Sequence, residues 1–325
     1  MGDQMHRLSV RRSRIRAVVL STAIALVASS CYHWNTLYDG GPLNDPLITE
    51  TFTLGPYDLA GNDQPGWEVL GNREIPRPTG NVAIKRVDFD VVDGDGNSIT
   101  SHLVHLHHIV VRDTGRADPL CGGGARFTGT GLERTPTILW GDYAYLSEAG
   151  DAWEANFHLH TTTPTAVDDV HIEYTVQYET WTDPTEFRST TPYFLDVTGC
   201  GQGSIYDVPG DGGPASVHVA SQTYTAPVDG IAVFAGGHIH AGGIDATLTR
   251  EATGEDYCTA TAQYTATTHH PSHPNLGTLN RITHCVMHSE VAAGEQFTLR
   301  ATYDNEYFVG KAMGIMLTHV WHPEP

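Results

Sequence analysis

The sequence predicts an all-β protein made of two jelly-roll-like antiparallel β-sandwich domains. Apolar and polar residues alternate with a period of two, most clearly over residues 170–178 and 297–303, as expected for strands with one buried face. No stretch after residue 31 holds the period of an amphipathic helix, and 34 glycines and 18 prolines supply frequent turns. Strands separated by close turns favour sandwiches over mixed α/β folds.

Residues 1–31 have the composition of an export signal. An arginine-rich start precedes an apolar segment, residues 17–27, that is too short to span a bilayer comfortably. Small residues then lead to Cys31, as in a bacterial lipobox, so we expect Cys31 to carry a lipid; an ordinary cleaved signal is the alternative. These features predict a bacterial protein of the periplasm or cell surface that meets the membrane only through this anchor.

The rest of the chain divides into a tether and two domains. Residues 32–50 are expected to form the tether. Glycine and proline gather over residues 200–203 and 209–214, the strongest break in the middle of the chain. We therefore place the two sandwiches at residues 51–205 and 206–325.

Apart from Cys31, the chain has four cysteines, an even number that suits an oxidising compartment. Three pairings are possible. We favour Cys121 with Cys200 and Cys258 with Cys285, because each bridge then stays within one half of the chain. A zinc site made of cysteine and histidine is the competing interpretation.

The chain is strongly acidic, with 18 Lys+Arg against 38 Asp+Glu and a formal charge of -20. This composition lacks the basic surface that nucleic acids or anionic membrane surfaces require. We expect no nucleic-acid partner.

Nineteen histidines, gathered in clusters, point to metal binding. Three clusters lie on predicted strands: His105, His107 and His108; His158 and His160; His238 and His240. Side chains two apart on a strand share a face, with Cα atoms roughly 6.5–7 Å apart, so two imidazoles can converge on one ion. By this rule His105 pairs with His107, and His107 and His108 point apart unless the strand twists or bulges. Neutral imidazoles suit copper or zinc.

The other histidines are expected to matter less. His171 lies on the polar face of its strand, and His269, His270 and His273 lie in a proline-containing loop that would bind metal only adventitiously. His284 and His288 flank Met287 on the opposite face of a strand. Met313 and Met316 also alternate faces, so one methionine could supply a thioether ligand.

Taken in order, these residues resemble the copper type II, ascorbate-dependent monooxygenases, the group that contains peptidylglycine α-hydroxylating monooxygenase and dopamine β-monooxygenase. The resemblance covers about residues 80–320. It rests on His107-His108-Ile109-Val110-Val111, Leu159-His160, His238-Ile239-His240 and the segment 310–316. The glycine pairs around His238 and His240 make the chain still more similar to related plant nodulin-type and bacterial exported proteins.

The resemblance implies two sandwiches that face each other across a solvent-filled cleft, with one copper on each. The electron-transfer copper would be bound by His107, His108 and His160, and the catalytic, oxygen-activating copper by His238, His240 and Met313. The less favoured ligands are His105, His158, Met287 and Met316. The implied activity is hydroxylation of a small organic substrate with O2 and ascorbate or another one-electron reductant. Gly236 and Leu317 replace an arginine and a tyrosine of the peptide-processing member, so a peptide C-terminus is not the expected substrate.

Two other functions stay open at this point. A non-catalytic copper- or zinc-binding lipoprotein would use the same histidines for capture or delivery. A β-sandwich interaction or carbohydrate-binding module would bind no metal tightly.

Overall fold

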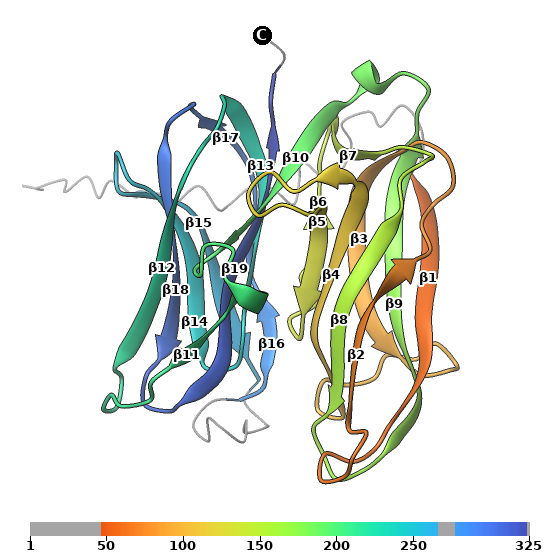
Figure 1. The fold of residues 1–325 in the computed structure, drawn as a ribbon, viewed down its shortest axis with the longest axis vertical. Helices are drawn as coiled ribbons and strands as arrows, with labels where there is room; N and C mark the ends of the chain where they lie inside the picture. Colours follow the sequence, from red (N-terminus) through yellow and green to blue (C-terminus); the bar gives the residue numbers. More distant parts are fainter. Residues whose placement is uncertain (1–46, 266–276, 324–325) are drawn as a thin grey trace, which may run out of the picture. The chain divides into compact units, whose positions relative to one another are not determined.

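The computed structural model describes residues 47–265 and 277–323, which belong to one compact unit. Within these ranges the chain forms nineteen β-strands and two short 3-10 turns, η1 (Pro184–Glu186) and η2 (Gln202–Ser204) (Figure 1). The predicted all-β class is confirmed. No helix in these ranges is long and apolar enough to cross a membrane. The export signal, Cys31, most of the tether and the loop histidines His269, His270 and His273 lie outside the described residues.

One long sheet runs through both halves of the described chain. Across this sheet the strands follow the order β1 (Ile48–Leu59), β9 (Val167–Thr180), β3 (Val82–Val92), β7 (Tyr143–Ser147), β10 (Arg188–Asp196), β19 (Val309–Trp321), β13 (Gly230–Ile239) and β17 (His284–Val291). Two short strands extend it: β6 (Thr137–Ile138) pairs with β3, and β11 (Ile205–Val208) pairs with β19. The pairing is antiparallel except between β7 and β10, where two residue pairs run parallel.

Two smaller sheets complete the sandwiches. The four-stranded sheet has the order β2 (Glu68–Ile75), β8 (Trp153–Thr161), β4 (Val104–Ala117) and β5 (Gly124–Gly131). The five-stranded sheet has the order β12 (Val217–Thr225), β18 (Gln296–Asp304), β14 (Gly243–Arg250), β15 (Glu255–Tyr264) and β16 (Leu279–Ile282). The predicted boundary near residue 205 coincides with the start of β11 and stays a prediction.

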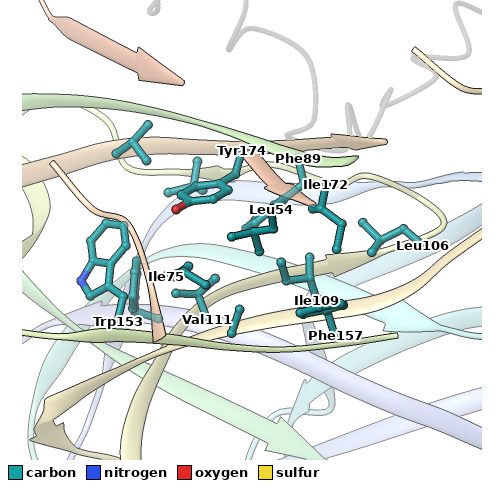
Figure 2. Packing of buried hydrophobic residues seen from close by; sticks show 14 of the residues in the cluster. Leu54, Ile75, Phe89, Leu106, Ile109, Val111, Trp153, Phe157, Ile172 and Tyr174 are labelled. Carbon is teal, nitrogen blue, oxygen red and sulfur yellow. The ribbon is translucent and has the colours of Figure 1, made fainter. Parts of the chain in front are cut away.

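Two hydrophobic cores hold these layers together. In the first, alternate residues of β4 and β8 pack against β1, β3 and β9; Figure 2 shows Leu106, Ile109, Val111, Trp153 and Phe157 among them. Burial of each such side chain contributes about 1.5–3 kcal/mol. The second core joins the five-stranded sheet to β10, β13 and β19, with Leu248, Leu299 and Tyr303 near its centre. The inward faces of β4, β8, β13 and β19 are therefore apolar, and the histidines of these strands lie on their outward faces, beside a smaller cluster of Phe194, Met313, Ile315 and Leu317.

Both favoured disulfides are present. Cys121 and Cys200 have Cα atoms 5.5 Å apart, and Cys258 and Cys285 have Cα atoms 6.0 Å apart, as disulfide bonds require. All four cysteines are thus used, and the competing zinc site made of cysteine and histidine is wrong. Two disulfides indicate an oxidising compartment.

Candidate metal centre

A β-bulge in β4 places three histidines on one face of the four-stranded sheet. Against β8, Leu106 pairs with Leu159, but His108 pairs with the next residue, His158, so β4 holds one extra residue at this point. Leu106 and Ile109 are both buried in the core although they are three apart. A bulge shifts the alternation of side chains by one residue. As a result His107 and His108 both point away from the core, together with His105.

Two polar neighbours fix the protons of His108 and His158. Asn156 Nδ2 donates to the Gly71 carbonyl at 3.4 Å, so Asn156 Oδ1 accepts from His108 Nε2 at 3.0 Å. Glu68 Oε2 accepts from His158 Nε2 at 2.9 Å. A neutral imidazole has a single proton, so the Nδ1 lone pair of each ring is left free. No sequence pattern marks Asn156 or Glu68, which are single polar residues on neighbouring strands.

The three imidazoles converge. One ring nitrogen from each of His107, His108 and His158 lies within 4.8 Å of the others. The Nδ1 atoms of His107 and His108 are 3.2 Å apart. Two nitrogens bound tetrahedrally to one zinc or copper ion at about 2.0–2.1 Å lie about 3.3 Å from each other. The three residues thus have the spacing of a metal centre.

Burial keeps the rings of His107, His108, His160 and His240 neutral. Desolvation, followed by the nearby His240, moves the pKa of His107 far below its ordinary value. Desolvation and the neighbouring His238 lower the pKa of His108 to about 4. Burial also lowers the pKa values of His160 and His240. Neutral imidazole is the form that binds metal, so at neutral pH no proton has to be displaced from these rings.

A second donor set lies on the outward face of β13 and β19. His238 is opposite Ile315 and Gly236 is opposite Leu317 in this antiparallel pair, so these residues share a face. Continued by two residues, the same register sets His240 opposite Met313. Tyr303 Oη fixes this end of the pair, because it accepts from the His240 backbone N–H at 2.7 Å and donates to the Met313 carbonyl at 2.6 Å.

Two ring nitrogens of this second set have no hydrogen-bond partner among the described residues. They are His238 Nε2 and His240 Nε2, and both are buried. The ring centres of these two histidines are 5.2 Å apart. Of the three predicted methionines, Met313 alone lines the cavity beside these rings, whereas Met287 and Met316 are buried in the second core.

The two predicted ligand sets adjoin. The ring centres of His107 and His240 lie 4.3 Å apart, so the histidines form one continuous cluster where two sites separated by a solvent-filled cleft were expected. A cavity of about 620 Å³ reaches the cluster, with His107, His108, His158, His238 and Met313 in its lining. Its apolar wall is formed by Val110, Phe194, Ile315 and Leu317. A small molecule can therefore approach the histidines from this side.

His160 and His105 lie beside the three converging histidines and not among them. Their ring centres are 4.9 Å apart, and both residues pair across β4 and β8. His160 Nδ1 donates to the Thr161 carbonyl at 3.1 Å. Both rings line a second cavity of about 330 Å³, which also includes His240. His158, expected only as a less favoured ligand, converges with His107 and His108, whereas His160 does not; the ligand assignment itself stays a prediction.

Three other histidines considered in the sequence, His171, His284 and His288, lie apart from the cluster. His171 contacts Asp169 at 3.0 Å on β9, and His288 contacts the Tyr143 hydroxyl at 3.1 Å. His284 packs beside Phe234. These three residues lie outside the candidate metal centre.

Comparison with known proteins identifies no family. The chain matches no family model, and no curated protein matches it. A peptide-N(4)-(N-acetyl-β-D-glucosaminyl) asparagine amidase is similar over 85% of this chain and 98% of its own, with 9% identity and a TM-score of 0.38. PNGF-II is similar over 83% of this chain and 65% of its own, slightly under two thirds, with 10% identity and a TM-score of 0.38. The major capsid protein P2 of bacteriophage PM2 is similar over 85% of this chain and 98% of its own, with 10% identity and a TM-score of 0.34.

None of these proteins is a copper monooxygenase. The comparisons therefore contradict the predicted membership in the copper type II, ascorbate-dependent monooxygenases. The predicted activity as an oxygen-dependent hydroxylase depended on that membership and is wrong as well. The merged histidine cluster departs from the expected geometry as well. With TM-scores below 0.5, the similarities transfer neither amidase activity nor capsid assembly to this chain.

Proposed function

We propose that this protein binds a divalent transition-metal ion, copper or zinc, through His107, His108 and His158. The observation that supports the proposal best is the convergence of one ring nitrogen from each of the three residues within 4.8 Å. The Nδ1 atoms of His107 and His108 are also only 3.2 Å apart. Because Asn156 and Glu68 engage Nε2 of His108 and His158, a neutral ring at either position keeps a lone pair on Nδ1. Hydrogen-bonded outer partners of this kind raise metal affinity.

The donor set favours copper and zinc over other divalent ions. Imidazole nitrogens are borderline donors that suit zinc and copper, whereas magnesium and calcium prefer oxygen ligands. Glu68 is the nearby carboxylate that could add an oxygen ligand and so favour magnesium or calcium. One of its oxygens already accepts a hydrogen bond from His158, so the imidazole preference for copper or zinc stands.

A second ion is proposed at His238, His240 and Met313. Two buried nitrogens without partners in the described chain support this site, and a thioether with two imidazoles suits copper in its reduced form. The total is about two ions per chain. The proposal is one of metal binding, with the 620 Å³ cavity as the route by which a small molecule reaches the ions. The one-electron reductant and the lipid on Cys31 stay predictions.

The alternative for His107 and His108 is a hydrogen bond in which one Nδ1–H donates to the other ring. That arrangement gives the same 3.2 Å distance and predicts no retained metal. The two possibilities are separated by the metal content of the purified protein.

The experiment compares the wild type with His108→Ala and with a matched control, His171→Ala. Each protein is stripped with a chelator, loaded with Cu(II) or Zn(II), desalted and submitted to elemental analysis. We expect about two ions per chain in the wild type and in His171→Ala, and one fewer in His108→Ala. Retention of no ion by the wild type, or equal retention by His108→Ala, would refute the proposal.

A further inference from the structure

Glu133 is a buried acidic residue that contacts the histidine cluster from the first half of the chain. Its side chain is 1% exposed. Oε1 accepts from the Gly131 backbone N–H at 3.0 Å and from His238 Nδ1 at 2.9 Å. Oε2 is buried and has no hydrogen-bond partner among the described residues. An isolated buried carboxylate is costly, so its position calls for a compensating positive partner.

The segment that carries Glu133, between β5 and β6, is held from both sides. Arg134 forms an ion pair with Asp90 and donates to the Ile99 carbonyl at 2.9 Å, which ties the segment to the first sandwich. Thr135 Oγ1 donates to the Ile282 carbonyl at 3.1 Å, which ties it to the second half. Glu133 is therefore fixed in place before any ligand arrives.

Gly131 allows the close approach of this segment to His238. A Cβ atom at Gly131 would lie 2.5 Å from His238 Cε1 and 2.8 Å from the His107 carbonyl oxygen. Only glycine fits between these two groups. The backbone thus brings the Glu133 carboxylate and the His238 ring into contact by direct packing.

We infer that Glu133 is a positioning residue for His238 as a metal ligand. The inference rests on the proposed second metal site. Glu133 Oε1 accepts the single ring proton at Nδ1, so Nε2, which is buried and has no partner among the described residues, keeps its lone pair for a metal ion. The carboxylate also supplies negative charge beside a site otherwise made of neutral donors, which offsets the charge of a bound cation.

A purely structural role makes a different prediction. If Glu133 only cross-linked the two halves, its replacement would lower stability without changing which nitrogen of His238 carries the proton. The protonated nitrogen can be read directly in the metal-free protein from the nitrogen NMR signals of labelled histidine, with His238 assigned by its absence in His238→Ala. We expect Nδ1 to be protonated and Nε2 to be bare in the wild type.

The variant test uses Glu133→Gln, with Glu148→Gln as the control. Glu148 lies in the same sandwich and pairs with Arg116 at 3.3 Å, away from the histidines. In Glu133→Gln we expect the preference for protonated Nδ1 to be lost, and copper affinity at the second site to fall about 10–100-fold. Copper binding at His107, His108 and His158 should be unchanged, and Glu148→Gln should match the wild type in both measurements.

Three results would overturn the inference. They are protonation of Nε2 in the wild-type apo protein, an unchanged tautomer in Glu133→Gln, and unchanged affinity of the second site in that variant. If Glu133→Gln does not fold, the tautomer of the wild type decides alone. If the wild type retains no metal, the proposed function fails, while the tautomer still tests the contact between Glu133 and His238.

Discussion

The Nδ1 atoms of His107 and His108 lie 3.2 Å apart although the two residues are consecutive in β4. In a regular strand, neighbouring side chains point to opposite faces. Here the extra residue opposite β8 turns both rings outward, toward His158. One bulge therefore converts a run of histidines into a set of converging donors.

Replacement of His240 by alanine should remove one bound ion and leave the other. His240 supplies a buried, unpartnered nitrogen to the second donor set, whereas the first set lies on β4 and β8. Elemental analysis after copper loading should show about one ion per chain instead of about two. Loss of both ions, or of neither, would contradict two adjoining sites.

Gly131→Ala should weaken both stability and the second metal site. The added methyl group would meet His238 Cε1 at 2.5 Å and a backbone oxygen at 2.8 Å, and the backbone has little room to move. Overpacking of this kind costs about 1–3 kcal/mol of the free energy of unfolding. Urea denaturation and copper titration measure the two effects. Gly150→Ala is the control, because nothing lies within 4 Å of its added Cβ, and equal behaviour of the two variants would count against the close approach.

His319 should make the protein less stable in acid. Its ring is fully buried, Nε2 donates to the Phe127 carbonyl at 2.8 Å, and burial lowers its pKa to about 4. An unfolded histidine has a pKa of about 6.5, so between these values the unfolded chain binds more protons and stability rises with pH. Acidification from pH 7 to 4.5 should cost about 2–3 kcal/mol through this residue.

The variant His319→Gln isolates that contribution, because the glutamine amide can still donate to Phe127. Urea denaturation of both proteins at pH 7 and pH 4.5 should show a smaller loss of stability for the variant. Other buried histidines, such as His284, act equally in both proteins and cancel in the comparison. An identical pH dependence would show that His319 is not buried in its neutral form.

Removal of the Cys258–Cys285 disulfide should destabilise the second sandwich. The bridge closes a loop with a sequence separation of 27 residues, which corresponds to about 3–4 kcal/mol of unfolded-state entropy. We expect the double variant Cys258→Ala/Cys285→Ala to lose about this much in denaturant unfolding. Copper binding at His107, His108 and His158 should survive, since that centre belongs to the other sandwich; its loss would link the bridge to the cluster.

The sequence alone determined the fold class and the strands that carry the histidines. It left three pairings of the four cysteines open, and the structure shows the favoured one. Alternation of apolar and polar residues is a local property, so it is readable without knowledge of the partner strands. It also placed His238 and His240 on one face; in the structure both line the smaller cavity, and His238 lines the larger one together with Met313. The resemblance drawn from the order of the histidines, in contrast, led to a family that the comparisons do not support.

Only the tertiary structure decided which histidines meet. The β4 bulge depends on register against β8, and the contact between His107 and His240 depends on how residues more than a hundred positions apart pack. Glu133 gave no signal at all, because it is one of 38 acidic residues and its role arises from a buried contact across the two halves. Strand periodicity specifies a face, whereas register and packing between sheets specify which side chains share a site.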